Sequence, residues 1–287
     1  MYADIKQSIT TNEVKKIFGN MKNAKTFLQK ANLFSNLPKK AKAEMLYQTI
    51  ALNWDYNNAL KIIREMFKKT DKYNSGKNAY DRFKLLETEW RNLGLGEIKW
   101  PFSAGQFDNY IQQVNKQNNS GLSKDKEVKK NAVRFRRIKE INTCRNDFLE
   151  YLIFERHQNL IPTLTHQYGV DFFVDGIQYD QKVSKSPTAQ FQKDFGSDAK
   201  GIKKAIKNPQ LVAKYLYERQ DENRFGDNPR LLIVYMKENI SIDRVKQILQ
   251  NTTFNNPLQI NFQYPLDKKD KAKPCQYRTQ CFVVLLH

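Results

Sequence analysis

Two aspartates and a lysine lie around a tight-turn signal near the middle of the chain. In VDFFVDGIQYDQKV, residues 170–183, Asp171 and Asp180 flank an Asp175-Gly176 pair at equal distances. Asp-Gly between two runs of alternating apolar residues is a strong signal for a two-residue β-hairpin turn. In that register the two carboxylates face each other and start about 5 Å apart on one side of the sheet, where they repel unless a positive charge lies between them.

These residue types suit metal-assisted hydrolysis of a phosphodiester. Lys182 follows Asp180 by two residues and is expected on the same side of the hairpin. Paired carboxylates suit a hard divalent cation such as Mg²⁺, which would polarise a phosphate and help ionise an attacking water. The lysine would orient that water or stabilise charge on phosphorus. The opposite side of the hairpin is predicted to be apolar and buried, with Val170, Phe172, Val174, Ile177, Tyr179 and Val183. The alternative is an exposed ion pair between Asp180 and Lys182 on a surface hairpin.

An aspartate on one strand followed by Asp-x-Lys on the next resembles the PD-(D/E)xK nuclease superfamily, which has the restriction-endonuclease-like fold. The chain reads Val170-Asp171 and then Asp180-Gln181-Lys182, with valine in place of the proline of the family name. The resemblance covers about residues 141–287. It implies an upstream helix with a glutamate that assists the metal, for which Glu150 is the best match and Glu155 the second. It further implies that Asp171, Asp180 and Glu150 bind Mg²⁺, with Mn²⁺ as a substitute, and that these three and Lys182 are catalytic.

The second half of the chain predicts a mixed sheet flanked by helices. TCRNDFLEYLIFERHQN and AKGIKKAIKNPQLVAKYLYERQ have helical periodicity, and Pro209 is expected to break or kink the second helix. RLLIVYM has the pattern of a buried strand, and Ser241 is a suitable N-cap for a helix in SIDRVKQILQNT. Further strands are expected in IPTLTHQYGVDFFV, IQYDQKVS, QINFQYPL and TQCFVVLL. The fold class predicted is α/β (mixed α+β), with a restriction-endonuclease-like core preceded by an all-helical domain.

The apolar residues of the first half recur with the spacing of helices. It predicts a bundle or winged assembly of about five or six helices, with breaks at NSGK and WPFS. One apolar face is expected along NEVKKIFGNMKNAKTFLQKANLF, formed by Val14, Ile17, Phe18, Met21, Phe27 and Leu28. We expect residues 1–140 to form a DNA-binding and recognition domain, residues 141–287 to form the nuclease domain, and a hinge to lie near the boundary.

The charge balance favours a polyanionic partner. The chain has 49 Lys and Arg residues against 30 Asp and Glu, a formal net charge of +19. Cationic side chains that neutralise phosphates release condensed counterions, and this drives nucleic-acid binding. A basic segment, SKDKEVKKNAVRFRRIKEI, is expected either to contact phosphates or to form a solvated helix face. The expected DNA-binding residues are Lys129, Lys130, Arg134, Arg136 and Arg137 in this segment, and Lys185, Gln190 and Lys193 in the loop after the motif.

Other classes of site find little support. Three scattered cysteines and only three histidines argue against a disulfide scaffold and against a zinc site. No apolar run approaches the roughly 18 residues that a membrane span needs, so we expect a cytoplasmic protein without a membrane partner. The function expected is a Mg²⁺-dependent endonuclease acting on double-stranded DNA, most simply a Type II restriction endonuclease that acts as a homodimer. Two alternatives stay open: a repair, recombination or mobile-element nuclease that recognises DNA structure, and a non-catalytic nucleic-acid-binding protein.

Overall fold

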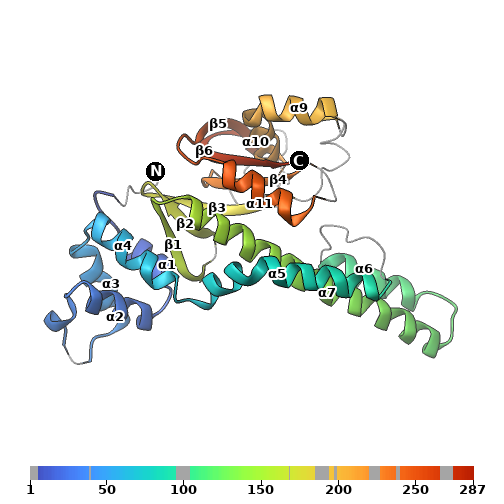
Figure 1. Ribbon diagram of the computed structural model, residues 1–287, viewed down its shortest axis with the longest axis horizontal. Coiled ribbons are helices and arrows are strands. Elements are labelled where there is room, and N and C mark those ends of the chain that lie inside the picture. The colour runs from blue at the N-terminus through green and yellow to red at the C-terminus, as the bar shows by residue number, and fades with distance from the viewer. Residues whose placement is uncertain are drawn as a thin grey trace.

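The protein is described by a computed structural model that covers residues 6–38, 40–94, 104–167, 169–184, 194–196, 199–219, 227–236, 240–265 and 274–287 (Figure 1). The first half is helical: α1 Thr11–Phe18, α2 Met21–Lys30, η1 Phe34–Asn36, α3 Ala43–Leu52, α4 Tyr56–Phe67, α5 Asp71–Asn92, α6 Ala104–Asn115 and α7 Gly121–Arg156. The second half is mixed: β1 Leu160–Gln167, β2 Val170–Val174, β3 Ile177–Ser184, α9 Ala199–Lys207, α10 Pro209–Glu218, β4 Arg230–Tyr235, α11 Ile242–Asn251, β5 Leu258–Pro265 and β6 Pro274–Leu286.

The described strands form one six-stranded mixed sheet in the order β1-β2-β3-β4-β6-β5. Strands β1, β2 and β3 are antiparallel, β3, β4 and β6 run parallel, and β5 returns antiparallel to β6. This confirms the expected mixed α+β architecture with a sheet flanked by helices. Parallel neighbours need a crossover, and the helices α9 and α10 provide it between β3 and β4.

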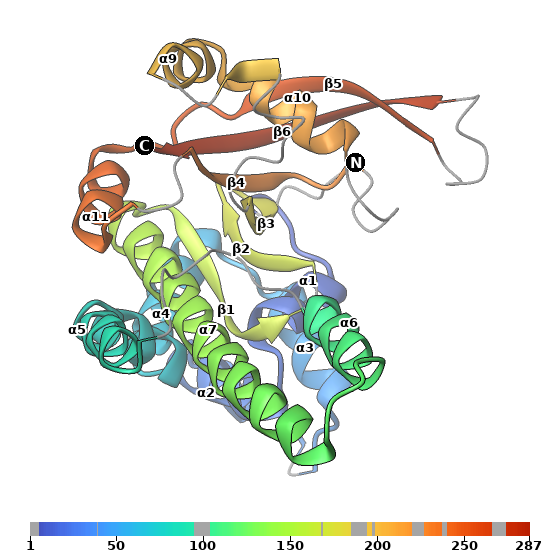
Figure 2. The same ribbon diagram turned by 90° about the vertical axis from the view of Figure 1, so that its right-hand side faces the viewer.

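Both faces of the sheet are covered, which is why β4 is buried along its whole length. Leu231 and Ile233 point into the larger apolar core, which contains side chains of α1 to α5, α7 and α11. Leu232 and Val234 point into a second core with α9, α10, β5 and β6. Figures 1 and 2 show α9 and α10 on one side of β4–β6 and α11 on the other. The prediction of a buried strand in RLLIVYM is therefore confirmed.

The central hairpin has the predicted turn. Asp175 and Gly176 both adopt positive φ, 50° and 90°, as a two-residue turn between twisted strands requires. The register pairs Phe172 with Tyr179 and Val174 with Ile177. The pairing ends there, because the amide of Gln181 donates a hydrogen bond to the Asp171 carboxylate. Asp171 and Asp180 are the residues directly beyond the last pair, each four residues from the turn, as the predicted register requires.

The side of the hairpin that carries the aspartates is covered near the turn. Phe173 lies on that side and is 1% exposed. Its register partner Gln178 accepts a hydrogen bond of 3.2 Å from Lys16 of α1. Helix α1 from the N-terminal half therefore covers this side near the turn, and the polar site is confined to the outer end of the hairpin.

Several local predictions were too coarse. IPTLTHQYGVDFFV, expected as one alternating run, forms β1 and β2, and Gly169 between them has φ 76°. NEVKKIFGNMKNAKTFLQKANLF forms two helices, because Gly19 adopts φ 70° and closes α1. Met21 is consequently 37% exposed and is not part of the expected apolar face. The break expected at NSGK is wrong, since these residues continue α5.

Two local signals in the second half are confirmed. Pro209 occupies the first turn of α10 and separates it from α9. The Ser241 hydroxyl accepts a hydrogen bond of 3.2 Å from the amide of Arg244, which is the predicted N-cap of α11. The expected break at WPFS lies outside the described residues.

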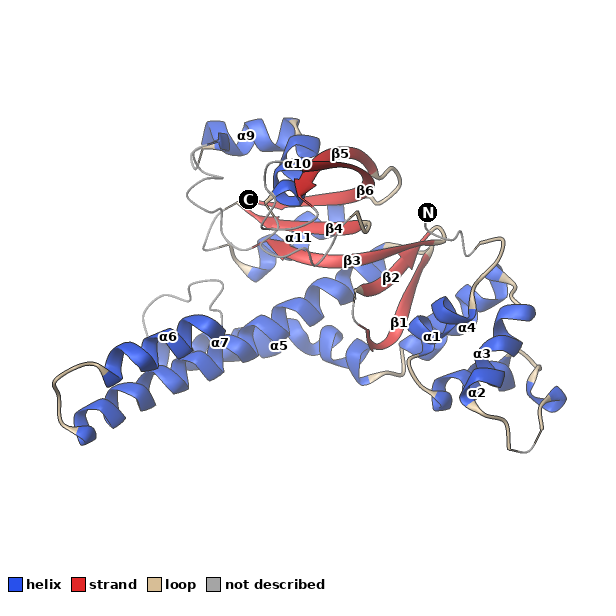
Figure 3. Ribbon diagram, turned by 180° about the vertical axis from the view of Figure 1, so that it is seen from behind, coloured by secondary structure: helices blue, strands red, loops and turns tan. Residues whose placement is uncertain are grey.

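The hinge expected near residue 140 is wrong, because α7 crosses this position as one helix of 36 residues. At 1.5 Å per residue it is about 54 Å long. The division between residues 1–140 and 141–287 thus falls inside α7, and the larger core joins side chains from Ile9 to Leu286. Figures 1 and 3 show the N-terminal part of α7 projecting away from the sheet together with α6 and part of α5. We call this projection the helical arm.

Candidate active site

Asp171 is the most strongly perturbed carboxyl of the site. It lies on β2, and one carboxylate oxygen accepts a hydrogen bond of 2.7 Å from the backbone amide of Gln181 on β3. Burial raises the pKa of Asp171 to about 6, and the negative charges of Glu150 and Asp180 contribute to this rise. The Gln181 amide and the Lys72 ammonium group act in the opposite direction. An acid in this position is costly to ionise unless more positive charge reaches it.

Asp180 is buried beside two cations. It is 7% exposed, and its carboxylate lies 3.3 Å from the Lys182 ammonium group and 3.9 Å from the Arg230 guanidinium. The short distance to Lys182 agrees with the prediction that both side chains leave the same side of β3. Arg230 is the register partner of Asp180 on β4. Because Asp180 is buried, the alternative of an exposed surface pair does not describe this contact.

Glu150 comes from α7 and has a partner that the sequence did not reveal. Its carboxylate lies 2.6 Å from the ammonium group of Lys72 on α5, and the two side chains are 16% and 8% exposed. Glu150 is within electrostatic reach of Asp171, whose pKa it raises. The second choice, Glu155, accepts a hydrogen bond of 3.4 Å from Tyr73 and is exposed, away from this cluster.

The cluster therefore combines three carboxylates with three cations, drawn from α5, α7, β2, β3 and β4. Sequence analysis found the acids and Lys182 but missed Lys72 and Arg230. A basic residue at the start of the apolar run RLLIVYM was a signal for Arg230, whereas the helical context of Lys72 offered none. Among the residues that the structure describes, no three Asp, Glu, His or Cys side chains converge as a ready-made metal site.

Two other candidate groups have packing roles. Burial raises the pKa of the Cys144 thiol to about 11, and its sulfur lies 3.1 Å from the carbonyl oxygen of Ala79. His157 is buried, and its ring contacts the carbonyl oxygen of Phe254 at 3.1 Å. Neither arrangement activates a nucleophile or a metal ligand.

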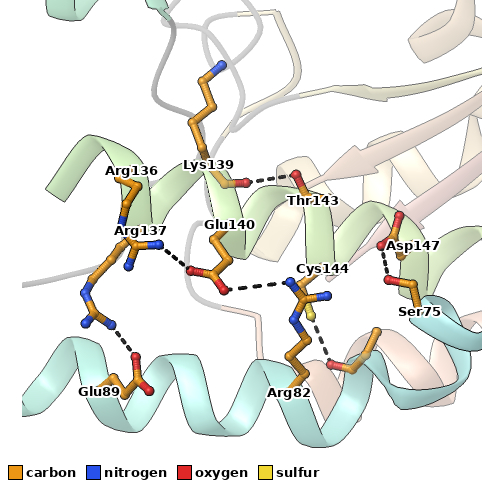
Figure 4. Close-up of polar contacts among 11 residues, drawn as sticks. Ser75, Arg82, Glu89, Arg136, Arg137, Lys139, Glu140, Thr143, Cys144 and Asp147 are labelled. Carbon is orange, nitrogen blue, oxygen red and sulfur yellow. Dashed lines mark hydrogen bonds and ion pairs between the residues drawn. The ribbon is translucent and has the colours of Figure 1, made fainter. Parts of the chain in front are cut away.

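The basic residues of α7 divide into two groups. Arg137 pairs with Glu89 of α5, and the Arg134 guanidinium lies 5.9 Å from the centre of the Trp90 ring, also on α5. The two arginines are half-buried and hold α5 against α7. Figure 4 shows Arg137 reaching across to α5. Arg136 is exposed and pairs with Glu140 at 2.9 Å. Lys129 and Lys130 are exposed on the helical arm, where a phosphate backbone could approach them. Lys185, Gln190 and Lys193 lie outside the described residues.

The comparisons with known proteins add no assignment. No family model matches the chain, and neither a curated protein nor a solved structure matches it. None of the helices in the described ranges is both long enough and apolar enough to cross a membrane.

Proposed function

We propose that the protein is a Mg²⁺-dependent endonuclease that hydrolyses phosphodiester bonds of double-stranded DNA. The observation that carries this proposal is the cluster at the outer end of the central hairpin. Asp171 on β2 and Asp180 on β3 lie just beyond the last register pair, Phe172 and Tyr179, and Lys182 lies 3.3 Å from Asp180. The negative charges of Glu150 and Asp180 both act on Asp171. Buried acids whose charges disfavour one another are common where a protein does chemistry.

The order of elements around the cluster also supports the proposal. A helix carrying Glu150 precedes three antiparallel strands, two of which carry Asp171, Asp180 and Lys182, and helices then lead to β4, which is parallel to β3. This is the order that the resemblance to the PD-(D/E)xK nucleases implies for residues 141–287. The proposed assignment to that superfamily rests on this order together with the Asp and Asp-x-Lys motif.

The residues fit a hard divalent cation in their donor chemistry. Oxygen ligands are what Mg²⁺ prefers, and Asp171, Asp180 and Glu150 supply carboxylates whose mutual repulsion such an ion would offset. When bound, Mg²⁺ or Mn²⁺ would polarise the phosphate and lower the pKa of the attacking water. The Lys182 side chain is 40% exposed and can reach a phosphate from its position beside Asp180, where it would stabilise the charge that develops on phosphorus.

The helical arm and the net charge support DNA as the partner. Lys129 and Lys130 are exposed on α7, and the chain carries a formal net charge of +19. Phosphate contacts of this kind hold a duplex without reading its sequence. We propose a Type II restriction enzyme that acts as a homodimer, with one active site for each DNA strand.

The test is a cleavage assay on several DNAs with Mg²⁺. Wild type is expected to cut a plasmid into fixed fragments, whereas cutting only at branches would favour a repair, recombination or mobile-element nuclease. Asp180→Asn and Lys182→Met are expected to lose cleavage and to keep DNA binding in Ca²⁺. Asp175→Asn is the matched control, because Asp175 is a turn residue of the same hairpin with φ 50°, a conformation that asparagine also tolerates.

A non-catalytic nucleic-acid-binding protein is favoured by one observation. Glu150 and Asp180 already have lysine partners at 2.6 and 3.3 Å, so the acids do not need an ion to be neutralised. This alternative predicts that wild type binds DNA and cuts no nucleic acid with Mg²⁺ or Mn²⁺. That result would overturn the proposed activity.

A further inference from the structure

Lys72 reaches the candidate active site from outside the sheet and the helix that carry the motif. It lies in the first turn of α5, whose N-terminus is capped by the Thr70 hydroxyl, which accepts a hydrogen bond of 3.2 Å from the Tyr73 amide. A cation in the first turn of a helix is disfavoured by the helix dipole. Its position there is therefore explained by a partner outside α5, and that partner is Glu150 at 2.6 Å.

The packing of α5 on α7 makes this contact possible. At Gly76 a Cβ atom would lie 2.5 Å from the Asp147 carbonyl oxygen and 2.6 Å from the Tyr151 Cβ, so the two helices touch through backbone here. The Ser75 hydroxyl donates a hydrogen bond to the Asp147 carboxylate beside this crossing. The close approach brings the Lys72 side chain to Glu150 on the neighbouring helix.

Burial makes the pair specific. The two side chains are 8% and 16% exposed, and buried charges are tolerated only when they are paired with good geometry. Removing either partner leaves the other charge buried and uncompensated. Glu150 is therefore held in one orientation by Lys72, within electrostatic reach of Asp171.

We propose that Lys72 is a positioning residue of the active site, which holds the Glu150 carboxylate in one orientation through their 2.6 Å ion pair. The inference rests on the proposed function and extends it, because the N-terminal helices then contribute to the catalytic site as well as to DNA binding. Lys72 acts through Glu150 and contacts neither the substrate nor the scissile phosphate.

The experiment compares Lys72→Met, Glu150→Gln and the double variant with wild type. Lys77→Met is the matched control, because Lys77 is an exposed lysine of the same helix. Mn²⁺ affinity is measured by calorimetry without DNA, and cleavage is measured as a function of Mg²⁺ concentration. Lys72→Met is expected to weaken Mn²⁺ binding and to slow cleavage by about 10- to 100-fold, as found for residues that orient metal ligands. Lys77→Met should match wild type in both.

The double variant decides how Lys72 acts, and it leaves no unpaired buried charge if Lys72→Met alone fails to fold. Affinity and rate equal to those of Glu150→Gln support the inference. If the double variant binds Mn²⁺ more weakly or cuts more slowly than Glu150→Gln, Lys72 acts independently of Glu150 and the inference is overturned. Tighter Mn²⁺ binding in Lys72→Met would also overturn it, because the lysine would then only compete with the ion. If wild type is active and Lys72→Met has the same Mn²⁺ affinity and cleavage rate as Lys77→Met, this inference fails and the proposed function stands. If wild type neither binds Mn²⁺ nor cuts DNA, the proposed function fails and this role fails with it.

Discussion

Replacing Asp171 by asparagine should stabilise the fold while removing activity. The folded-state pKa of Asp171 is about 6, against a reference value of 3.8. This difference corresponds to about 3 kcal/mol of unfavourable free energy for the ionised carboxylate in the folded state. Asparagine keeps an oxygen that can accept the hydrogen bond from the Gln181 amide, and it carries no charge to repel Glu150 or Asp180.

The sign of the pH dependence follows from the raised pKa. The folded state binds the Asp171 proton more tightly than the unfolded state, so this contribution to stability is fully present below pH 3.8 and is lost as pH rises through 6. The free energy of unfolding of Asp171→Asn should therefore exceed that of wild type by little at about pH 4 and by about 3 kcal/mol at about pH 8. For a chain of this size that is a rise of about 6 °C in melting temperature.

The assay is thermal unfolding of wild type and Asp171→Asn at several pH values between about 4 and 8, without divalent ions. Asp175→Asn is the control, because the Asp175 side chain is 38% exposed and pairs with Lys6 at 3.0 Å on the surface. It should change the melting temperature little at any pH. Equal or lower stability of Asp171→Asn at the alkaline end would refute the argument that the hairpin holds an electrostatically disfavoured acid.

Three further predictions concern the ion, the partner and the fold. Mg²⁺ or Mn²⁺ should raise the melting temperature of wild type at alkaline pH and leave that of Asp171→Asn nearly unchanged, which a thermal-shift titration would measure. Replacing Lys129 and Lys130 by methionine should weaken DNA binding. It should also reduce the slope of the logarithm of the binding constant against the logarithm of salt concentration by up to about 0.9 for each phosphate that is no longer neutralised. Replacing Arg137 should mainly lower the stability of the fold, because Arg137 pairs with Glu89 of α5. Gly76→Ala should cost about 1–3 kcal/mol in chemical denaturation, since the new methyl group meets the backbone of α7.

Features encoded by neighbouring residues were predictable from the sequence. The Asp175-Gly176 turn, the start of α10 at Pro209 and the cap at Ser241 each depend on the conformational preference of one or two residues. The positions of Asp171 and Asp180, directly beyond the pair Phe172 and Tyr179, were predictable for the same reason, because a two-residue turn leaves only one register for the strands it joins.

Features that depend on distant contacts were missed. The continuity of α7 through residue 140 was hidden because its arm is basic and solvated while its other half is apolar, so one helix carries two patterns. The glycine in NSGK suggested a break, yet Gly76 is the point where α5 touches α7. A glycine at a helix crossing and a glycine in a turn look alike until the second helix is in place.

The sequence by itself determined the central hairpin, the acid on each of its strands and the lysine beside Asp180, because strand alternation and turn chemistry are local properties. Only the tertiary structure decided the electrostatic state of that site. Three charged residues of the site lie outside the motif in sequence. Packing of the helices brings Lys72 within salt-bridge distance of Glu150, and strand pairing brings Arg230 beside Asp180. Charge interactions depend on distance in space and on burial, and both are properties of the folded chain.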